Sequence, residues 1–323
     1  MHIVTGGAGF IGSAFIWKLN EMGIDDVIVV DNLGETEKWK NLVNRRYVDY
    51  FHRDDFLDMV LHDELPFEVE SMTHMGACSS TTERNADFLM ENNYRYSVAL
   101  ATWCLEHDAR FINASSASTY GDGALGFADD ETLIPSLKPL NMYGYSKQLF
   151  DLWALRAGCM GRLASLKFFN VFGPNEYHKD DMRSVICKAY KQIGETGAMR
   201  LFKSYHPDFV DGGQKRDFVY VKDCVDVMWW LLEKPQVGGV FNIGTGQARA
   251  WNDLARAVFA AMDVPEDIHY IDMPVELQGK YQYFTEATMD KLTAAGCPVK
   301  FTSLEDAAAD YVQNYLAQPD PHL

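Results

Sequence analysis

Residues 2–12 read His-Ile-Val-Thr-Gly-Gly-Ala-Gly-Phe-Ile-Gly, and this stretch decides the fold. A short apolar run leads into glycines at positions 6, 9 and 12, and apolar residues at helical spacing then continue to Met22. Glycines at this spacing allow a tight backbone turn and let the N-terminus of a helix approach a pyrophosphate. The stretch therefore predicts a strand, a glycine turn and a helix that together bind a dinucleotide.

A second apolar run, residues 27–30, ends at Asp31, nineteen residues after the last of these glycines. An acidic side chain at this place commonly binds the ribose hydroxyls of NAD, and its charge repels the 2′-phosphate of NADP. NADP is favoured instead by three neighbouring residues, Asn32, Lys38 and Arg53, because two cations and an amide can hold a phosphate. Asp31 alone therefore favours NAD, whereas its neighbours leave NADP open.

Strand-like and helical patterns alternate along the chain. Apolar runs predict further strands at residues 111–114, 164–169, 216–221 and 240–244. Helical periodicity predicts helices at residues 10–22, 97–106, 146–157, 182–193, 223–233, 251–262 and 303–316. Strands that are apolar throughout and alternate with helices indicate a parallel sheet covered on both faces. We therefore expect an α/β protein built on a Rossmann-type doubly wound parallel sheet.

The pattern changes after about residue 170, where Gly, Pro, Asp, His and Lys become frequent. We expect residues 1–169 to form a NAD(P)-binding Rossmann domain, to which residues 217–247 return. Residues 170–216 and 248–323 are then expected to form a smaller mixed α/β C-terminal lobe that binds the substrate. A length of 323 residues suits such a division.

The composition excludes several classes of partner. Its 29 Lys and Arg against 46 Asp and Glu give a formal net charge of −17, which repels nucleic-acid phosphate and anionic membrane surfaces. The apolar runs fall short of the roughly 20 residues of a membrane helix. The motif that begins at residue 2 leaves no room for a signal peptide, and the six cysteines show neither C-x-x-C nor zinc spacing. We therefore expect a cytoplasmic protein with reduced thiols, no metal, and no nucleic-acid or membrane partner.

A second motif points to proton transfer. Tyr143 and Lys147 form Y-x-x-x-K, and on a helix these two side chains share a face. The lysine ammonium is expected to lower the pKa of the phenol, which would make Tyr143 a base at neutral pH. Upstream, the hydroxyl-rich segment 115–120 follows an apolar strand, and the carboxyl ends of parallel strands are where α/β proteins hold substrate.

Five features occur in order along nearly the whole chain: T-G-G-x-G-F-I-G, the strand that ends at Asp31, S-S-x-x-x-Y-G, Y-x-x-x-K and R-D-F-V-Y-V-x-D. Together they resemble the extended short-chain dehydrogenase/reductase family of nucleotide-sugar enzymes. The resemblance implies a catalytic serine, tyrosine and lysine at Ser116, Tyr143 and Lys147, with Ser118 as an alternative to Ser116. It also implies a small-molecule nucleotide sugar as substrate.

Further segments resemble the ADP-heptose 6-epimerases of this family, which make precursors of the lipopolysaccharide inner core. These segments are residues 76–83, 92–94, 169–179 and 279–282. The resemblance implies a tightly bound NADP, with NAD as the alternative, and a homo-oligomer, with a pentamer as the expected state. The positions implied to bind the cofactor are Gly6, Gly9, Phe10, Ile11, Gly12, Asp31, Asn32, Lys38, Arg53, Met75, Gly76, Ala77, Cys78, Ser79, Asn92, Tyr143, Lys147, Val171 and Lys179.

The implied reaction inverts a carbinol carbon, C6″ of the sugar, whose hydrogen is too weakly acidic to leave as a proton. Oxidation to a ketone and return of the hydride to the opposite face inverts the carbon without consuming the cofactor. Each orientation of the substrate needs its own proton donor or acceptor. The resemblance assigns Tyr143 to one orientation and Lys179 to the other, with Ser116 bonding the reacting oxygen. One objection to Lys179 as a neutral base is that the adjacent acids Asp180 and Asp181 are expected to keep its pKa high.

The resemblance also implies a set of substrate-binding residues. They are Ser116, Asn170, Asp181, Lys188, Phe202, Lys203, Ser204, Tyr205, Arg216 and Tyr281. Arg216 suits a diphosphate because its guanidinium binds oxygens in pairs, although a structural ion pair with Asp217 is the alternative. Asp181, Lys188 and the loop 205–213 depart from the subfamily pattern, which leaves the sugar contacts there open.

Three other functions compete with this interpretation. A UDP-hexose 4-epimerase stays open, whereas a 4,6-dehydratase would need an Asp-Glu pair after the catalytic serine, and residues 117–119 contain no acid. A non-catalytic NADP-binding protein of the same fold would usually lack the Tyr143–Lys147 pair. The histidines predict no independent site: His74 is expected to be a satisfied buried imidazole, and His178 is either a loop histidine or a substrate contact.

Overall fold

The computed structural model of the protein describes residues 1–278 and 281–323, and its centre is a parallel sheet of seven strands. The strands are β1 (His2–Thr5), β2 (Val27–Asp31), β3 (Asp49–His52), β4 (Ser71–His74), β5 (Arg110–Ser116), β6 (Ala164–Phe168) and β10 (Gly239–Ile243). Their order in the sheet is β10-β6-β5-β4-β1-β2-β3, which places β1 between β4 and β2 and reverses the strand order there. This is the doubly wound arrangement that the sequence predicts, and the expected fold class is confirmed.

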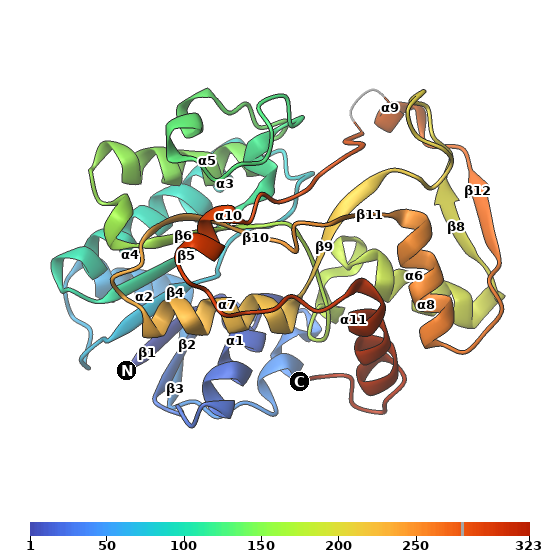
Figure 1. The fold of residues 1–323 in the computed structure, drawn as a ribbon. Helices are drawn as coiled ribbons and strands as arrows, with labels where there is room; N and C mark the ends of the chain where they lie inside the picture. The colour runs from blue at the N-terminus through green and yellow to red at the C-terminus, as the bar shows by residue number, and fades with distance from the viewer. Residues whose placement is uncertain (279–280) are drawn as a thin grey trace.

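Helices cover both faces of this sheet (Figure 1). On one face lie α1 (Phe10–Glu21) and α7 (Val221–Glu233), and on the other lie α2 (Arg53–Leu61), α4 (Tyr96–Glu106) and α5 (Met142–Arg156). The side chains of β1 and β2 alternate between the two cores: Val4 and Val29 pack with α1 and α7, whereas Ile3 and Ile28 pack with α2, α4 and α5. Strands β1 and β2 are buried on both faces, which explains their nearly uninterrupted apolar runs.

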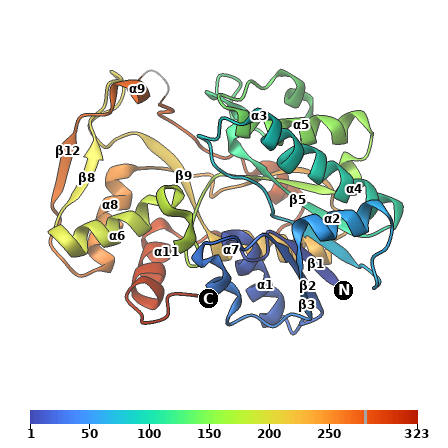
Figure 2. The same cartoon turned by 180° about the vertical axis from the view of Figure 1, so that it is seen from behind.

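A smaller lobe lies beside the carboxyl ends of the strands (Figure 2). It contains a three-stranded sheet of β7 (Asn170–Phe172), β9 (Lys215–Tyr220) and β11 (Ala248–Ala250), and a pair of β8 (Met199–Phe202) with β12 (Ile268–Ile271). Its longer helices are α6 (Val185–Thr196), α8 (Trp251–Ala261) and α11 (Leu304–Tyr311). The polypeptide returns to the large sheet through β10, which pairs with β6, while β9 pairs with β7 and β11.

Short helices complete the fold. They are α3 (Ala86–Leu89), α9 (Val275–Gln278), α10 (Asp290–Ala294), η1 (Glu37–Leu42), η2 (Met90–Arg95), η3 (Ala117–Tyr120), η4 (Glu131–Ser136), η5 (Met160–Arg162), η6 (Tyr177–Met182) and η7 (Val312–Leu316). Two differences from the predicted elements affect the site. Helix α5 begins at Met142, four residues earlier than predicted, and α6 begins at Val185, because residues 177–182 form the separate turn η6.

All six cysteines are free thiols, and four of them are buried. Among residues 1–278 and 281–323, no helix is long and apolar enough to cross a membrane. Among the side chains of residues 1–275, 278 and 281–323, His, Cys, Asp and Glu form no cluster that could hold a metal ion.

Candidate active site

Five parallel strands of the large sheet end at one cleft of about 410 Å³. Its wall consists of the glycine turn after β1, Asp31 at the end of β2, the turn after β4, Ser116 at the end of β5 and Phe168 at the end of β6. A second pocket of about 210 Å³ shares four lining residues with it, Asp31, Lys38, Gly76 and Ala77. All nineteen residues predicted to bind the cofactor line one or both of these spaces.

The glycine turn is closed to side chains. A Cβ atom at Gly12 would lie 2.1 Å from the carbonyl oxygen of Gly6, and one at Gly6, whose φ is +65°, would lie 2.5 Å from the backbone nitrogen of Gly76. The turns after β1 and β4 therefore touch through backbone atoms alone, and they form an uncovered wall where a pyrophosphate can approach. This geometry fits the dinucleotide that the spacing of the glycines predicts.

Asp31 is surrounded by donors. Its carboxylate accepts hydrogen bonds from the backbone N–H of Ala8 at 2.9 Å and of Asn32 at 2.7 Å, and from the ammonium of Lys38 at 2.7 Å. The backbone bond to Ala8 ties the end of β2 to the glycine turn. Because Lys38 pairs directly with the carboxylate, the negative charge of Asp31 is compensated inside the pocket.

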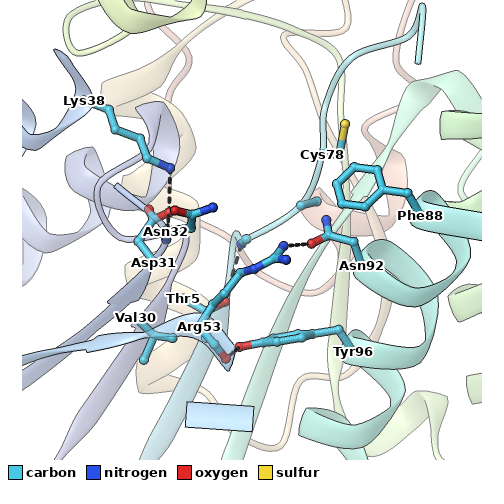
Figure 3. A pocket seen from close by; sticks show the side chains of 12 residues that line it. Thr5, Val30, Asp31, Asn32, Lys38, Arg53, Cys78, Phe88, Asn92 and Tyr96 are labelled. Carbon is cyan, nitrogen blue, oxygen red and sulfur yellow. Dashed lines mark hydrogen bonds and ion pairs between the residues drawn. The ribbon is translucent and has the colours of Figure 1, made fainter. Parts of the chain in front are cut away.

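The smaller pocket has cations on two sides (Figure 3). Lys38 extends from η1 on one side, and Arg53, the first residue of α2, faces it from the other and donates a hydrogen bond to the side-chain oxygen of Asn92. The hydroxyl of Tyr96 fixes the backbone of Arg53 by donating to its carbonyl oxygen at 3.0 Å. Two cations and two amides around one opening suit an anionic group such as a phosphate.

Tyr143, Lys147 and Ser116 meet in the larger cleft. Asn141 caps α5 by accepting from the N–H of Gly144 at 2.8 Å, so Tyr143 lies in the first turn and Lys147 lies one turn later on the same face. Ser116 lines the cleft, and its hydroxyl oxygen accepts a hydrogen bond from the backbone N–H of Ser118. Ser118, the alternative candidate for the catalytic serine, does not line the cleft.

Burial governs the protonation of these groups. It lowers the pKa of Lys147 to about 8, against the opposing charge of Asp151. It raises the pKa of Tyr143, and a hydrogen bond with the Ser116 side chain opposes that rise. The prediction that Lys147 lowers the pKa of Tyr143 is therefore wrong for this structure, because desolvation dominates and the group that favours the phenolate is Ser116.

Lys179 reaches the cleft from η6, and a buried carboxylate holds this segment in place. Glu176 is 1% exposed and accepts from the hydroxyls of Ser184 at 2.6 Å and Tyr311 at 3.0 Å. Burial lowers the pKa of Lys179, and Glu176 opposes it. The objection from the adjacent acids at positions 180 and 181 is wrong, because both are exposed to solvent and desolvation outweighs their charge.

The two histidines behave differently. His74 is fully buried between Thr5, whose hydroxyl lies 2.5 Å from Nδ1, and Ser97, whose hydroxyl lies 2.8 Å from Nε2. Burial lowers its pKa to about 3, so the prediction of a satisfied neutral imidazole is confirmed. His178 lines the cleft and contacts Asn41, and burial followed by the charge of Lys179 lowers its pKa to about 4.

Arg216 is buried away from both pockets. Its guanidinium donates to the carbonyl oxygens of Lys215 at 2.8 Å and of Gln282, and it stacks 5.2 Å from the ring of Tyr281. The alternative ion pair with Asp217 is wrong, because that carboxylate accepts instead from Thr245, Gly246 and Ala287.

The other predicted substrate contacts divide into two groups. Asn170 lines the large cleft beside Ser116. The remaining positions lie on the smaller lobe outside the lining of both pockets, and they are Asp181, Lys188, Phe202, Lys203, Ser204, Tyr205 and Tyr281. Lys203 and Tyr205 both contact the carboxylate of Asp272, at 3.0 and 3.2 Å. Gly279 and Lys280, which contribute to the resemblance, lie outside the described residues.

Two aromatic residues of the smaller pocket, Phe88 and Tyr96, are not among the predicted site residues. Both flank the predicted Asn92 at a distance of four residues, and residues 86–106 form one continuous helical segment. Positions 88, 92 and 96 therefore share a face. The helical spacing of these three was the signal that would have identified them.

Known proteins resemble this chain over its whole length. The model of the NAD dependent epimerase/dehydratase family matches residues 2–244. A relative named ADP-L-glycero-D-manno-heptose-6-epimerase from Nitratidesulfovibrio vulgaris (strain Hildenborough) is 72% identical over 323 residues, with 100% of both chains covered. One of the same name from Fusobacterium nucleatum is 49% identical, again with 100% of both chains covered.

Solved structures give the same result. The crystal structure of the ADP-L-glycero-D-manno-heptose-6-epimerase of Helicobacter pylori matches with a TM-score of 0.80 and 26% identity, covering 98% of this chain and 96% of that one. A UDP-glucose 4-epimerase of Thermotoga maritima matches with a TM-score of 0.77 and 27% identity, covering 96% of each. The chain therefore belongs to the NAD dependent epimerase/dehydratase family and, within it, to the ADP-L-glycero-D-manno-heptose-6-epimerases.

Proposed function

We propose that this protein converts ADP-D-glycero-β-D-manno-heptose to ADP-L-glycero-β-D-manno-heptose by inverting C6″, in the synthesis of lipopolysaccharide inner-core precursors. The observation that carries the proposal is the convergence of two proton-transfer groups from separate elements on one cleft, Tyr143 from α5 and Lys179 from η6. An epimerase that oxidises and reduces the same carbon in two orientations needs two such groups. The relatives at 72% and 49% identity carry the name of this activity.

The roles of the side chains follow from their positions. When bound, the nicotinamide would supply a reversible hydride acceptor beside these side chains. In one orientation Tyr143 would act as the phenolate, the form that Ser116 favours, and take the hydroxyl proton as the carbinol becomes a ketone. Ser116 would also donate a hydrogen bond to the reacting oxygen. After the sugar rotates, Lys179 returns a proton to the oxygen as the carbinol re-forms. The lowered pKa of Lys179 favours this exchange, because a buried ammonium gives up its proton readily.

We propose NADP as the cofactor, with NAD as the alternative. The glycine turn would hold the pyrophosphate, and Lys147 would hold the nicotinamide ribose. Asn32, Lys38 and Arg53 would bind the 2′-phosphate, and their common position around the smaller pocket supports this assignment. The ion pair between Lys38 and the Asp31 carboxylate also favours NADP, because it reduces the charge that would repel the phosphate.

We further propose that the lobe formed by residues 170–216 and 248–323 binds the nucleotide sugar against the domain formed by 1–169 and 217–247. Asn170 would contact the sugar from the edge of the cleft. For the predicted residues that line neither pocket, contact with the substrate stays a prediction. We also propose that the protein is cytoplasmic and forms a homo-oligomer, with a pentamer as the expected state.

The test is an incubation of the purified protein with ADP-D-glycero-β-D-manno-heptose, followed by proton NMR at C6″. We expect conversion to a mixture of the two epimers without net formation of NADPH. UDP-galactose serves as the parallel substrate, and Tyr143→Phe serves as the inactive control. Conversion of UDP-galactose in place of the heptose would contradict the proposal and would identify a 4-epimerase. No conversion of either substrate, with NADP and NAD both supplied, would favour a non-catalytic protein.

A further inference from the structure

A buried ion pair lies directly behind the cleft. The ammonium of Lys167 on β6 is 2.9 Å from the carboxylate of Asp151 on α5, and the two side chains are 1% and 0% exposed. Desolvating two charges costs several kcal/mol per ion, so such a pair contributes little net stability on average. The roles proposed above for the cleft residues do not involve either side chain.

The pair is adjacent to the lysine of the Y-x-x-x-K motif. Asp151 follows Lys147 by one turn on the same face of α5, and both are buried. The other titratable groups that face Lys147 are Tyr143 on α5, Cys78 after β4 and His74 on β4, and His74 is uncharged. A carboxylate at this place favours the ammonium form of Lys147.

The pair is also bonded to the strand that carries Ser116. The hydroxyl of Ser115 donates to Asp151 at 2.8 Å, which joins α5 to the end of β5. Lys167 donates to the hydroxyl oxygen of Thr119 at 2.6 Å, and that hydroxyl donates to the carbonyl oxygen of Ser116 at 2.8 Å. One ion pair therefore contacts the supports of both Lys147 and Ser116.

We propose that Asp151 and Lys167 are positioning residues of the epimerase site: Asp151 holds a carboxylate opposite Lys147, and Lys167 pairs with Asp151 and fixes the turn that carries Ser116. The link to Ser116 rests on the proposed function, whereas the link to Lys147 is a property of the protein alone. Removing Lys167 would leave a buried carboxylate without its cation, which is strongly disfavoured, so the charge beside Lys147 depends on the pair.

The first experiment titrates Lys147 in the full-length protein. Lysine labelled with 13C at Cε reports each ammonium by NMR, and a Lys147→Arg variant identifies the signal. Lys147 is expected to titrate near 8 in the unmodified protein. Asp151→Asn should move this midpoint down by about one pH unit or more, because the charge of Asp151 opposes the lowering of the Lys147 pKa and a nearby opposite charge is worth about 1–3 units. Lys167→Met should move it in the same direction, and Lys167→Arg should leave it in place.

A second ion pair provides the matched control. Lys222 and Asp310 lie 2.7 Å apart, and Asp310 also accepts from a tyrosine hydroxyl, that of Tyr220. Asp310→Asn should leave the midpoint of Lys147 unchanged. The proposal is overturned if folded Asp151→Asn titrates like the unmodified protein, or if Asp310→Asn shifts Lys147 equally. Where Asp151→Asn does not fold, Lys167→Met gives the same test.

A further variant separates the two contacts of the pair. Thr119→Val removes the hydroxyl between Lys167 and Ser116 and leaves the ion pair intact. We expect kcat for epimerisation to fall about tenfold, the value of one hydrogen bond, with KM and the titration of Lys147 unchanged. An unchanged kcat would overturn the link to Ser116. The titration needs neither substrate nor turnover, so its result stands whether or not the epimerase reaction is correct.

Discussion

At the scale of single residues, desolvation controls the groups that would transfer protons. Burial raises the pKa of Tyr143 and lowers the pKa values of Lys147 and Lys179. These directions favour the uncharged form of each group. A neutral amine such as Lys179 can take a proton from a sugar hydroxyl directly, whereas Tyr143 can take one only as the phenolate, the form that its hydrogen bond with Ser116 favours.

The role of Tyr143 is tested by Tyr143→Phe. We expect turnover to fall by at least about 100-fold, because a positioned acid–base group contributes 10²–10⁴-fold. The affinity for NADPH, measured by its fluorescence, should change little because the ring is kept. Tyr145→Phe is the control, since Tyr145 lies two residues further along α5 and is 44% exposed. Full activity of Tyr143→Phe would show that another group is the base.

The cofactor preference is tested at the smaller pocket. Lys38→Met and Arg53→Met should each weaken NADP+ binding about tenfold or more, because a hydrogen bond to a charged group is worth about 1.5–3 kcal/mol. NAD+ binding should change far less, since it lacks the 2′-phosphate. Lys40→Met is the control in the same turn, because Lys40 pairs with Glu37 outside the pocket. Isothermal titration calorimetry with both cofactors measures the ratio, and equal losses for NAD+ and NADP+ would contradict the assignment.

At the scale of secondary structure, the glycine turn depends on close backbone contact. Gly12→Ala would place a methyl group 2.1 Å from the carbonyl oxygen of Gly6. We expect a loss of about 2 kcal/mol or more in the free energy of unfolding, typical of forced overpacking, together with loss of cofactor binding.

Gly194→Ala is the matched control for Gly12→Ala. Gly194 lies inside α6, is exposed and has open space around its Cβ position. It should stabilise the protein by about 0.5–1 kcal/mol through helix propensity. Urea unfolding of both variants measures the difference, and similar midpoints for the two would show that the turn tolerates a side chain.

How much of the fold is predictable depends on whether an element is both buried and apolar: β4 (Ser71–His74) is fully buried, but its Ser, Thr and His leave no apolar run. The apolar runs of β1 and β2 are buried on both faces, so their pattern identifies them. The strand β3 is partly exposed at the sheet edge, and α2 buries only Phe56 and Val60. Both elements were missed, because a half-exposed edge strand and two apolar residues leave no clear periodicity.

The same contrast holds for the site. The predicted cofactor residues follow local motifs at the ends of strands, and all of them line the cleft or its neighbouring pocket. Arg216 stays a prediction as a diphosphate ligand, and its guanidinium bonds to the carbonyl oxygen of Gln282, 66 residues away in sequence. Contacts across such separations depend on how the smaller lobe packs, and local spacing carries no information about them.

At the scale of the whole molecule, buried amides join the two lobes beside the cleft. Asn41 donates to the carbonyl oxygens of Ala8 at 2.9 Å and of Asn175 at 3.0 Å, and Asn175 donates to the hydroxyl of Ser13 at 2.9 Å. These bonds connect the glycine turn and α1 to the segment that carries Lys179. The position of Lys179, the proposed second proton-transfer group, is therefore tied to the segments that carry the proposed cofactor wall.

The stability of the whole molecule should fall in mild acid because of His74. Its pKa is about 3 in the folded protein, against 6.5 for a solvent-exposed histidine such as that of the unfolded chain, so between these values only the unfolded chain binds the proton. Stability is then lost as pH falls below 6.5, by about 1.4 kcal/mol per pH unit.

His74→Gln should reduce this slope, whereas His269→Gln, at a side chain that is 61% exposed, should leave it unchanged. The slopes are measured by urea unfolding of the three proteins at about pH 7.5, 6.5 and 5.5, the range in which a histidine titrates. Because all three proteins share the same carboxylates, the difference between their slopes excludes the carboxylate contribution. An identical slope in His74→Gln would mean that the central strand β4 accommodates the protonated ring.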